Sequence, residues 1–260
     1  MVMKITPSTR LLTIGSADAF NHCGKANSCF WVEDDIGKYL LDCGPTTPMA
    51  LQQLKVSSQL DLTQLDTIYL THLHGDHIGG LPVLLLELNF SLQRQVPLTI
   101  AGPIHTEERV RALCESSYPT ILSQIINFTI NFVEWPLTST TQIGGRTIRS
   151  IPALHDVNAF ATSINIQSEH TSITFSGDTG WNDALIPLSH HVDALVIECS
   201  YEKAVFSGHI GLDEITQHRD QLKPKLLILT HFSEGSRKAA SRKQANLNLQ
   251  IADDGVEWFL

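Results

Sequence analysis

One short stretch of the chain, residues 71–77 (THLHGDH), is dense in side chains that bind metal ions. In an extended segment His72 and His74, two residues apart, point to the same side. Asp76 and His77 follow on the next turn, where they could serve a second ion. Imidazole suits zinc, and carboxylate also accepts harder ions such as manganese. A polar surface turn with solvated histidines would need far fewer such groups, so the stretch predicts a metal site.

Four side chains cannot complete the coordination of two ions, and three further candidates stand elsewhere in the chain. His155, Asp178 and His231 each come just after an apolar, strand-like stretch. Taken singly, each could equally be a capping residue or a residue at the edge of the core. Together with the first group, they predict one site assembled at the ends of several strands.

These ligands need a scaffold, and the apolar patterning supplies one. Short runs with period-two alternation or continuous apolar character predict strands over residues 10–14, 28–33, 38–41, 67–70, 98–101, 128–135, 147–152, 159–166, 172–175, 194–197, 226–229 and 256–260. Helical patterns cover residues 47–55, 81–90, 106–116 and 211–222. The polar, basic stretch 233–246 could form a helix or a mobile flap. Two mixed sheets with helices outside them follow from this order.

The composition sets limits on the class of protein. The 260 residues contain 42% hydrophobic and 17% charged residues, which predicts a single globular domain over residues 1–260. The net charge of −9 argues against a protein whose main task is binding nucleic acid. The basic stretch 237–243 is read as a solvated helix face. Five cysteines without a C-x-x-C pair, and no apolar leader or membrane span, indicate a cytoplasmic protein.

The ligand pattern resembles a known family. The H-x-H-x-D-H turn, His155, the G-D-T at 177–179 and His231 look like the metallo-β-lactamase superfamily. The phrase THLHGDHIGGLP, with GSADAF, LDCGP and IAGP elsewhere, is similar to its ribonuclease Z-like branch. The resemblance extends from about residue 11 to residue 260. It implies an α/β fold, a four-layer αββα sandwich with two metal ions at one edge.

The resemblance also implies which side chains hold the ions: His72, His74 and His155 the first, Asp76, His77 and His231 the second, and Asp178 both. A carboxylate rather than a cysteine at position 178 favours a dinuclear centre. Two neighbouring cations need a shared anion; they lower the pKa of a bridging water towards about 7 and neutralise a phosphodiester. Asp76 could also orient that water or accept its proton. Zinc is the default ion, with manganese or iron open.

A second pair, Glu198 and His209, resembles the proton-donating pair of the same branch. This chain reads IECS and GHI where the branch usually has HEAT and HST. A histidine is the natural donor near neutral pH, and a carboxylate can hold its ring and keep it charged. The alternative is a salt pair behind the ligands, or a surface histidine.

The branch members that process tRNA carry a long flexible arm, in one common form between the third histidine ligand and the bridging aspartate. Here the interval from His155 to Asp178 is filled by two strands and a turn. The sequence therefore predicts a dinuclear metal-dependent hydrolase for a small phosphodiester, such as a cyclic nucleotide, with a homodimer expected by analogy. The alternatives are a ribonuclease Z-type tRNA 3′-end endonuclease, a hydrolase of an aryl sulfate, lactone or thioester, and a metal-binding protein without turnover.

Overall fold

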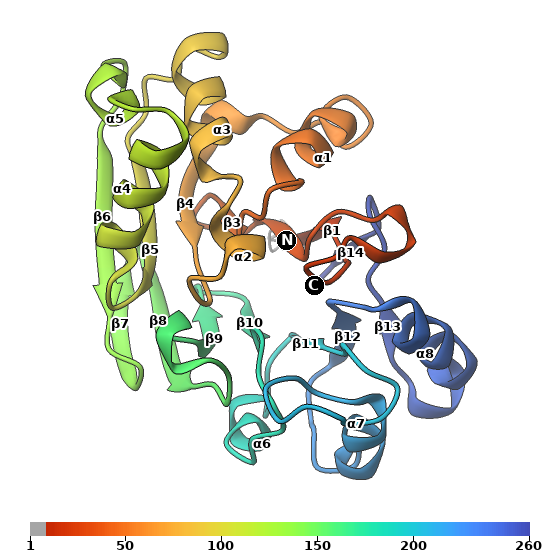
Figure 1. Ribbon diagram of the computed structural model, residues 1–260. Helices are drawn as coiled ribbons and strands as arrows, with labels where there is room; N and C mark the ends of the chain where they lie inside the picture. Colours follow the sequence, from red (N-terminus) through yellow and green to blue (C-terminus); the bar gives the residue numbers. More distant parts are fainter. Residues whose placement is uncertain (1–8) are drawn as a thin grey trace, which may run out of the picture.

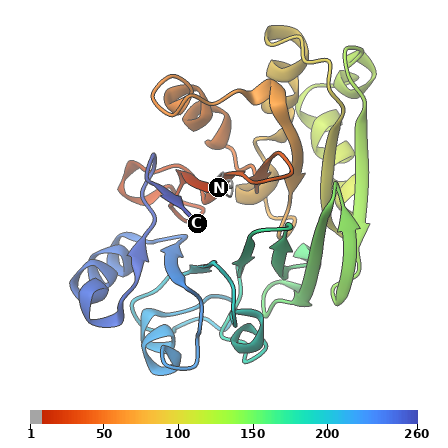
Figure 2. The ribbon, with the colours of Figure 1, turned by 180° about the vertical axis from the view of Figure 1, so that it is seen from behind.

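Two seven-stranded sheets lie face to face in the computed structural model, which describes residues 9–260, and helices cover the outer side of each sheet (Figure 1). This arrangement confirms the predicted αββα sandwich. Figure 2 shows the same division of the chain from behind. Most of the red to light green segments build one half of the sandwich, and most of the green to blue segments build the other, while the blue strand at the end of the chain returns to the first half.

The first sheet has the strand order β14-β1-β2-β3-β4-β5-β6. Its strands are β1 (Arg10–Gly15), β2 (Cys29–Glu33), β3 (Lys38–Leu41), β4 (Leu65–Tyr69), β5 (Leu98–Pro103), β6 (Ile130–Trp135) and β14 (Glu257–Phe259). Strands β3 to β6 run parallel. On its helical side lie α1 (Thr47–Leu54), α3 (Leu81–Leu86), α4 (Thr106–Ser117) and the short α5 (Ile121–Gln124). The strand β14 brings the end of the chain back beside β1.

The second sheet has the order β13-β12-β11-β10-β9-β8-β7. Its strands are β7 (Ser139–Ile143), β8 (Arg146–Pro152), β9 (Thr162–Gln167), β10 (Ser172–Phe175), β11 (Ala194–Glu198), β12 (Leu226–Thr230) and β13 (Gln250–Ile251). Strands β10 to β13 run parallel, and β8 points the same way because two antiparallel pairings separate it from β10. On its outer side lie α6 (Leu185–Leu188), α7 (Leu212–His218) and α8 (Glu234–Leu247).

The strand β11 shows how the sequence forms the layers. All five of its residues are buried, as expected for a central parallel strand that is covered on both faces. Its Ala194 and Val196 contribute to the core between the two sheets, whereas Leu195 and Ile197 belong to the core beneath the outer helices. A continuous apolar run is therefore what this position in the sandwich requires.

Some elements differ from the prediction. The expected helix over 81–90 ends at Leu86 and continues as a π-helical turn over Glu87–Ser91, and α7 ends at His218 rather than near residue 222. The strand expected from residue 159 begins at Thr162, because a 3-10 turn precedes it. The open choice for residues 233–246 is resolved in favour of a helix, α8. The edge strand β7 was not predicted, since its sequence STTQI is mostly polar.

Among residues 9–260, every helix falls short of the length and apolar character needed to cross a membrane.

Candidate metal centre

The carboxyl ends of the parallel strands place the candidate ligands at one edge of the sandwich. The stretch 71–77 follows β4, and His155 follows β8. Asp178 comes after β10 and His231 after β12. Because strands that point the same way end at the same edge of a sheet, side chains far apart in sequence meet there.

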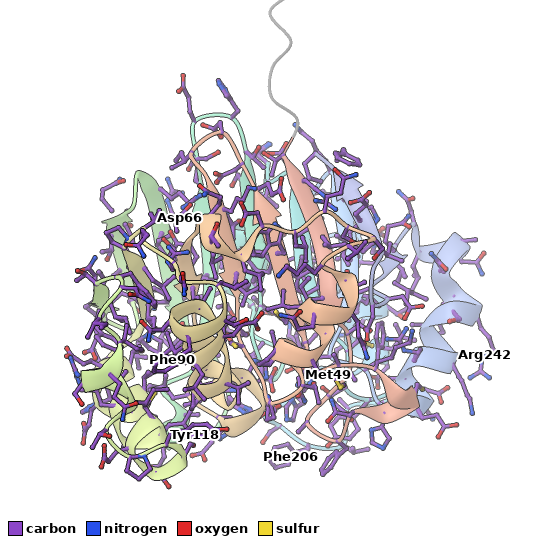
Figure 3. All side chains as sticks on the ribbon, turned by 90° about the horizontal axis from the view of Figure 1, so that it is seen from above. Met49, Asp66, Phe90, Tyr118, Phe206 and Arg242 are labelled. Carbon is purple, nitrogen blue, oxygen red and sulfur yellow. The ribbon has the colours of Figure 1, made fainter. Side chains whose placement is uncertain are left out.

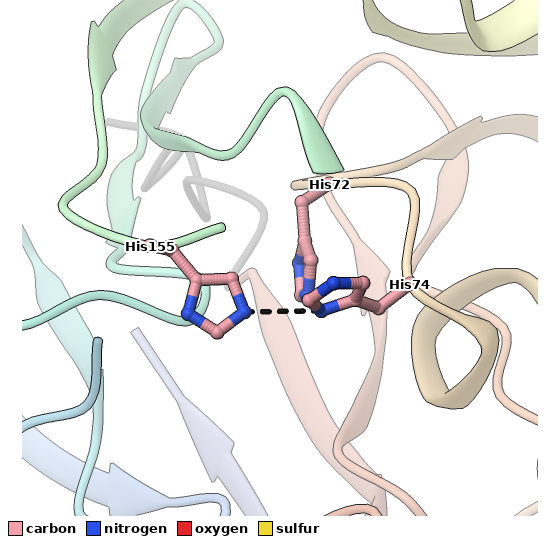
Figure 4. A group of neighbouring side chains, drawn as sticks. All are labelled: His72, His74 and His155. Carbon is pink, nitrogen blue, oxygen red and sulfur yellow. Dashed lines mark hydrogen bonds between the residues drawn. The ribbon is translucent and has the colours of Figure 1, made fainter. Parts of the chain in front are cut away.

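Three histidines form the first group, shown in Figure 4: His72, His74 and His155. One nitrogen of each ring lies within 4.8 Å of the others, and His155 Nε2 is 3.0 Å from His74 Nδ1. Burial lowers the pKa of His72 and His155 below the usual 6.5. The neutral imidazole that this favours is the form that binds metal ions.

The second group combines two carboxylates with two histidines. The short helix α2 (Gly75–Ile78) carries Asp76 and His77, and these meet Asp178 and His231 within 4.8 Å. Asp178 Oδ1 lies 3.4 Å from His77 Nε2, and Oδ2 lies 3.2 Å from His231 Nε2. The same Oδ2 is 3.8 Å from His72 Nε2 in the first group. Asp178 therefore stands between the two groups, as expected of a shared ligand.

Three ring nitrogens in this cluster lack a hydrogen bond. The Nε2 atoms of His72, His77 and His231 are buried, and none has a partner among the residues that the structure describes. A buried polar atom without a partner costs roughly 1–3 kcal/mol, and such atoms are uncommon. A metal ion that accepts these lone pairs would remove the cost, so the residues fit the ions that the sequence predicts.

The charges at the cluster favour a cation as well. Burial would raise the pKa of Asp178, but the histidines around it, His231 and His77 first, hold that pKa well below its usual range. Burial disfavours a charged His231, yet Asp178 and Asp76 raise its pKa to about 9. The negative potential that stabilises an imidazolium at this position would equally stabilise a divalent ion.

Asp42 orients one ligand from behind, and the sequence analysis missed it. His77 Nδ1 donates to Asp42 Oδ2 at 2.8 Å, which leaves the Nε2 lone pair facing the cluster. Asp42 also accepts hydrogen bonds from the backbone and hydroxyl of Thr71. Its φ of 59° is in the left-handed region, which non-glycine residues rarely occupy. The available signal was its place in LDCGP, directly after β3.

Glu198 and His209, the predicted proton-donating pair, lie together. His209 Nδ1 is 3.1 Å from both carboxylate oxygens of Glu198, which also accepts the backbone N–H of Thr179 at 2.5 Å. Burial raises the pKa of Glu198. Burial alone would lower the pKa of His209, but the hydrogen bond and charge of Glu198 raise it above 6.5. The pair therefore retains its proton to a higher pH than an isolated histidine.

Ser200 connects this pair to the metal cluster, and it was also missed. Its hydroxyl donates to Glu198 Oε2 at 2.5 Å and accepts from His231 Nδ1 at 2.9 Å. The proton on Nδ1 leaves the Nε2 lone pair of His231 facing Asp178. The signal was its position in IECS, two residues after Glu198.

A cavity of about 840 Å³ opens onto the cluster. Asp76, Asp178, His209 and His231 line its inner part. Phe20, Leu154, Val157 and Phe206 also line it and are largely exposed. Among the described residues that line the cavity there is no lysine or arginine. The cavity therefore pairs a polar, ion-binding floor with an apolar rim.

The chain matches several curated proteins over most of its length. Ribonuclease Z from Brevibacillus brevis is 27% identical, with 87% of this chain and 81% of that protein covered. The probable metallo-hydrolase YhfI from Bacillus subtilis is 24% identical, with 98% and 99% covered. Mitochondrial ribonuclease Z 2 from Schizosaccharomyces pombe is 28% identical over 84% of this chain, which spans only 34% of that protein.

Solved structures show the same fold. YhfI from Bacillus subtilis superposes with a TM-score of 0.75 at 19% identity, covering 98% of this chain and 100% of that one. The short form of human tRNase Z gives a TM-score of 0.72 at 22% identity, covering 96% and 98%. A diphosphatase of the PhnP family gives 0.72 at 17% identity, covering 96% and 97%. These structures confirm the predicted metallo-β-lactamase fold. The sequence relatives confirm the ribonuclease Z-like resemblance.

A family model decides the closer relationship. The model described as anti-Pycsar protein Apyc1 matches residues 9–253, which is nearly the whole chain. The chain has the metallo-β-lactamase fold and belongs to the anti-Pycsar protein Apyc1 family.

Proposed function

We propose that this protein is a dinuclear metal-dependent phosphodiesterase that cleaves a small phosphodiester, such as a cyclic nucleotide. The observation that carries the proposal is the set of three buried, unpaired histidine nitrogens, which face Asp76 and Asp178 beside an open cavity. Ribonuclease Z is among the sequence relatives, and its name states action on RNA, whose backbone is made of phosphodiesters.

The proposed ligand sets follow the two groups in the structure. His72, His74 and His155 would hold one ion, Asp76, His77 and His231 the other, and Asp178 both. The residues suit zinc, with manganese or iron as alternatives. Bound at this site, two divalent ions would activate a water for attack and neutralise the charge on the phosphodiester. Asp76 lines the cavity, where it can orient that water or accept its proton.

The pair of Glu198 and His209 would protonate the leaving oxygen. Glu198 engages His209 at Nδ1, so Nε2 remains to donate a proton to a bound substrate. His209 lines the cavity with its side chain 18% exposed, which gives it access to a ligand. General acid catalysis of this kind contributes about 10²- to 10⁴-fold to a rate.

The cavity favours a small substrate over a polynucleotide. Within the part of the chain that the structure describes, no lysine or arginine lines it, so further phosphates of an RNA strand would meet no basic partner. The net charge of −9 would oppose a polyanion as well. A second candidate is tRNA 3′-end cleavage, favoured by the identity of 27–28% to ribonuclease Z proteins. That activity would need a partner chain that supplies basic surface.

An assay of the purified protein with its metal content measured tests both candidates. The substrates are 3′,5′- and 2′,3′-cyclic nucleotides, an aryl phosphodiester, an aryl sulfate, a lactone and a precursor tRNA. We expect about two ions per chain and turnover of cyclic nucleotides and the aryl phosphodiester, lost with a chelator and restored by metal. Cleavage of the precursor tRNA alone would favour the second candidate. Turnover of only the sulfate or lactone, or of nothing, would overturn both.

A further inference from the structure

Each of the five histidines in the two ligand groups has one ring nitrogen that faces the cluster and one that contacts a group outside it. Four of these outer contacts go to a hydroxyl, a backbone carbonyl or a buried carboxylate: Thr71 for His72, Gly208 for His155, Asp42 for His77 and Ser200 for His231. The fifth histidine, His74, contacts Asp156, an exposed carboxylate that lines the cavity. Such outer partners decide which ring nitrogen carries the proton, and therefore which one can bind a metal ion.

His74 also presents a different nitrogen to the cluster. Its Nδ1 lies 3.0 Å from His155 Nε2, along the dashed line in Figure 4, whereas the other four histidines face the cluster with Nε2. His74 Nε2 points outward and lies 3.4 Å from Asp156 Oδ2. An ionised carboxylate accepts hydrogen bonds and cannot donate them. This contact therefore places the proton of the neutral His74 ring on Nε2 and leaves a lone pair on Nδ1.

Asp156 is held in this orientation by the turn that it begins. It caps the 3-10 turn η4 (Val157–Ala159), and its Oδ1 accepts from the backbone N–H of Asn158 at 2.9 Å and from the side-chain amide of Asn158 at 3.2 Å. Because both bonds go to one oxygen, Oδ2 remains for His74. Asp156 directly follows His155 in the chain, so one short segment supplies a candidate ligand and the outer partner of another.

The two facing nitrogens can adopt two arrangements. His155 Nδ1 donates to the carbonyl oxygen of Gly208 at 2.8 Å, which leaves a lone pair on His155 Nε2. With the proton of His74 on Nε2, both facing nitrogens carry lone pairs, and a cation between them would satisfy both. With the proton on His74 Nδ1, that nitrogen would instead donate to His155 Nε2, and each ring would occupy the metal-binding atom of the other. The contact with Asp156 favours the first arrangement.

We propose that Asp156 is a positioning residue that holds His74 in the Nε2–H tautomer and so keeps Nδ1 free for the first metal ion. This inference rests on the proposed dinuclear site and assigns the affinity for one of its ions to a residue outside the ligand set. Within residues 9–260, His74 is the one candidate ligand to which Asp156 is hydrogen-bonded. Asp156 should therefore affect the first ion and leave the second unchanged.

Competition with a chelator, with zinc as the probe, measures the dissociation constants of the two ions in the purified protein. We expect Asp156→Ala to weaken one ion by about 10- to 100-fold and to leave the other within about twofold. Asp156→Asn keeps an oxygen that can accept the Nε2 proton, so it should recover most of the affinity. The matched control is Asp61→Ala, since Asp61 is exposed and caps the 3-10 turn η2 (Leu62–Gln64) but does not line the cavity. The control should change neither constant.

The tautomer itself is measured on the metal-free protein from the ¹⁵N chemical shifts of the His74 ring. We expect the Nε2–H form in the wild-type protein, in Asp156→Asn and in Asp61→Ala. In Asp156→Ala the ring should shift towards the Nδ1–H form. Loss of the cap on the turn would by itself lower stability without moving this proton, so the measurement separates positioning from a merely structural role.

The outcomes separate this proposal from the proposed function. If Asp156→Ala binds both ions as tightly as the wild-type protein, or if both ions weaken equally, the role of Asp156 is wrong while the dinuclear site stands. A His74 ring that stays in the Nε2–H form in Asp156→Ala would also overturn it. If the wild-type protein binds fewer than two ions, the proposed dinuclear function fails, and the tautomer in the metal-free protein still decides whether Asp156 orients His74.

Discussion

Arg146 and His231 are both buried polar side chains, but their hydrogen-bonding groups are satisfied very differently. Arg146 makes four hydrogen bonds of 2.7–3.2 Å to Asp34 and Asp66, and its guanidinium lies 4.8 Å from the centroid of the Tyr39 ring. His231 has one nitrogen bonded to a serine hydroxyl, while its Nε2 has no hydrogen-bond partner within residues 9–260. Burial with charge is therefore common to a structural ion cluster and to a candidate metal site.

The difference lies in what remains unpaired. The Arg146 cluster pairs a cation of the chain with two carboxylates, so it has no need of an external ion. At the metal cluster the carboxylates face imidazole rings that can be neutral, and the lone pairs of these rings point toward one another. In Figure 3, Asp66 of the Arg146 cluster is labelled in the upper part of the molecule, whereas Phe206, which lines the cavity, is labelled at the lower edge. Unsatisfied, converging lone pairs are thus the better indicator of a ligand site.

Four substitutions test this comparison, and Asp178→Asn should have the largest effect on activity. The amide removes the negative charge between the two groups, so we expect kcat to fall on the order of 10³-fold or more, and bound metal per chain to decrease. Hydrolysis assays and elemental analysis measure the two quantities. The control Asp220→Asn removes an exposed carboxylate elsewhere and should change neither. A variant at position 178 with full metal content and full activity would contradict the shared-ligand assignment.

The opposite response is expected for Arg146→Met. Breaking the buried pair leaves Asp34 without its cation, so the free energy of unfolding should fall by about 3–5 kcal/mol in urea titrations. The rate per folded molecule should stay within about twofold, because the cluster takes no part in the site. Arg149→Met is the matched control, since Arg149 is exposed on the same strand and should shift stability by only about 0.5 kcal/mol. If Arg146→Met lost activity but kept its stability, the assignment of this cluster as purely structural would be wrong.

A smaller effect is expected for His209→Gln, with kcat lower by about 10²-fold. The acid acts in its protonated form, and Glu198 raises the pKa of His209 above 6.5. Wild-type kcat should therefore be maintained at neutral pH and fall as pH rises through that pKa. The variant should lose this alkaline fall in a pH–rate profile. His191→Gln, an exposed control, should keep it. An unchanged alkaline limb in His209→Gln would assign the proton to another group.

The smallest of these effects is expected for Ser200→Ala. Without the hydroxyl, His231 Nδ1 loses its acceptor and Glu198 loses a donor, so metal affinity should weaken by roughly 10- to 100-fold. Competition with a chelator measures the metal dissociation constant. Ser200→Thr keeps the hydroxyl and should recover most of the affinity. If alanine and threonine variants bind metal equally well, Ser200 has no part in orienting His231.

The sequence alone determined those features that depend on local spacing. The closeness of four candidate ligands follows from one strand end and one turn, because a few adjacent residues set the directions of their side chains: His72, His74, Asp76 and His77. The apolar runs of the strands and most helices were also readable, since each buried face imposes its own period. The strand ends also gave His155, Asp178 and His231 as candidate ligands. The resemblance of the motifs to the metallo-β-lactamase superfamily assigned these ligands to two ions and implied the four-layer sandwich.

Only the tertiary structure decided which distant side chains orient the ligands. Asp42 and Ser200 lie in the motifs LDCGP and IECS, but neither motif says which ligand the side chain contacts. Their contacts with His77 and His231 depend on how the strand ends align in the folded protein. The polar strand β7 likewise becomes a strand because β8 pairs with it, not because of its own residues. Phe20 belongs to the same group, since loops far apart in sequence share a cavity only after the sheets have packed. Long-range pairing is a property of the whole fold, and no short stretch of sequence contains it.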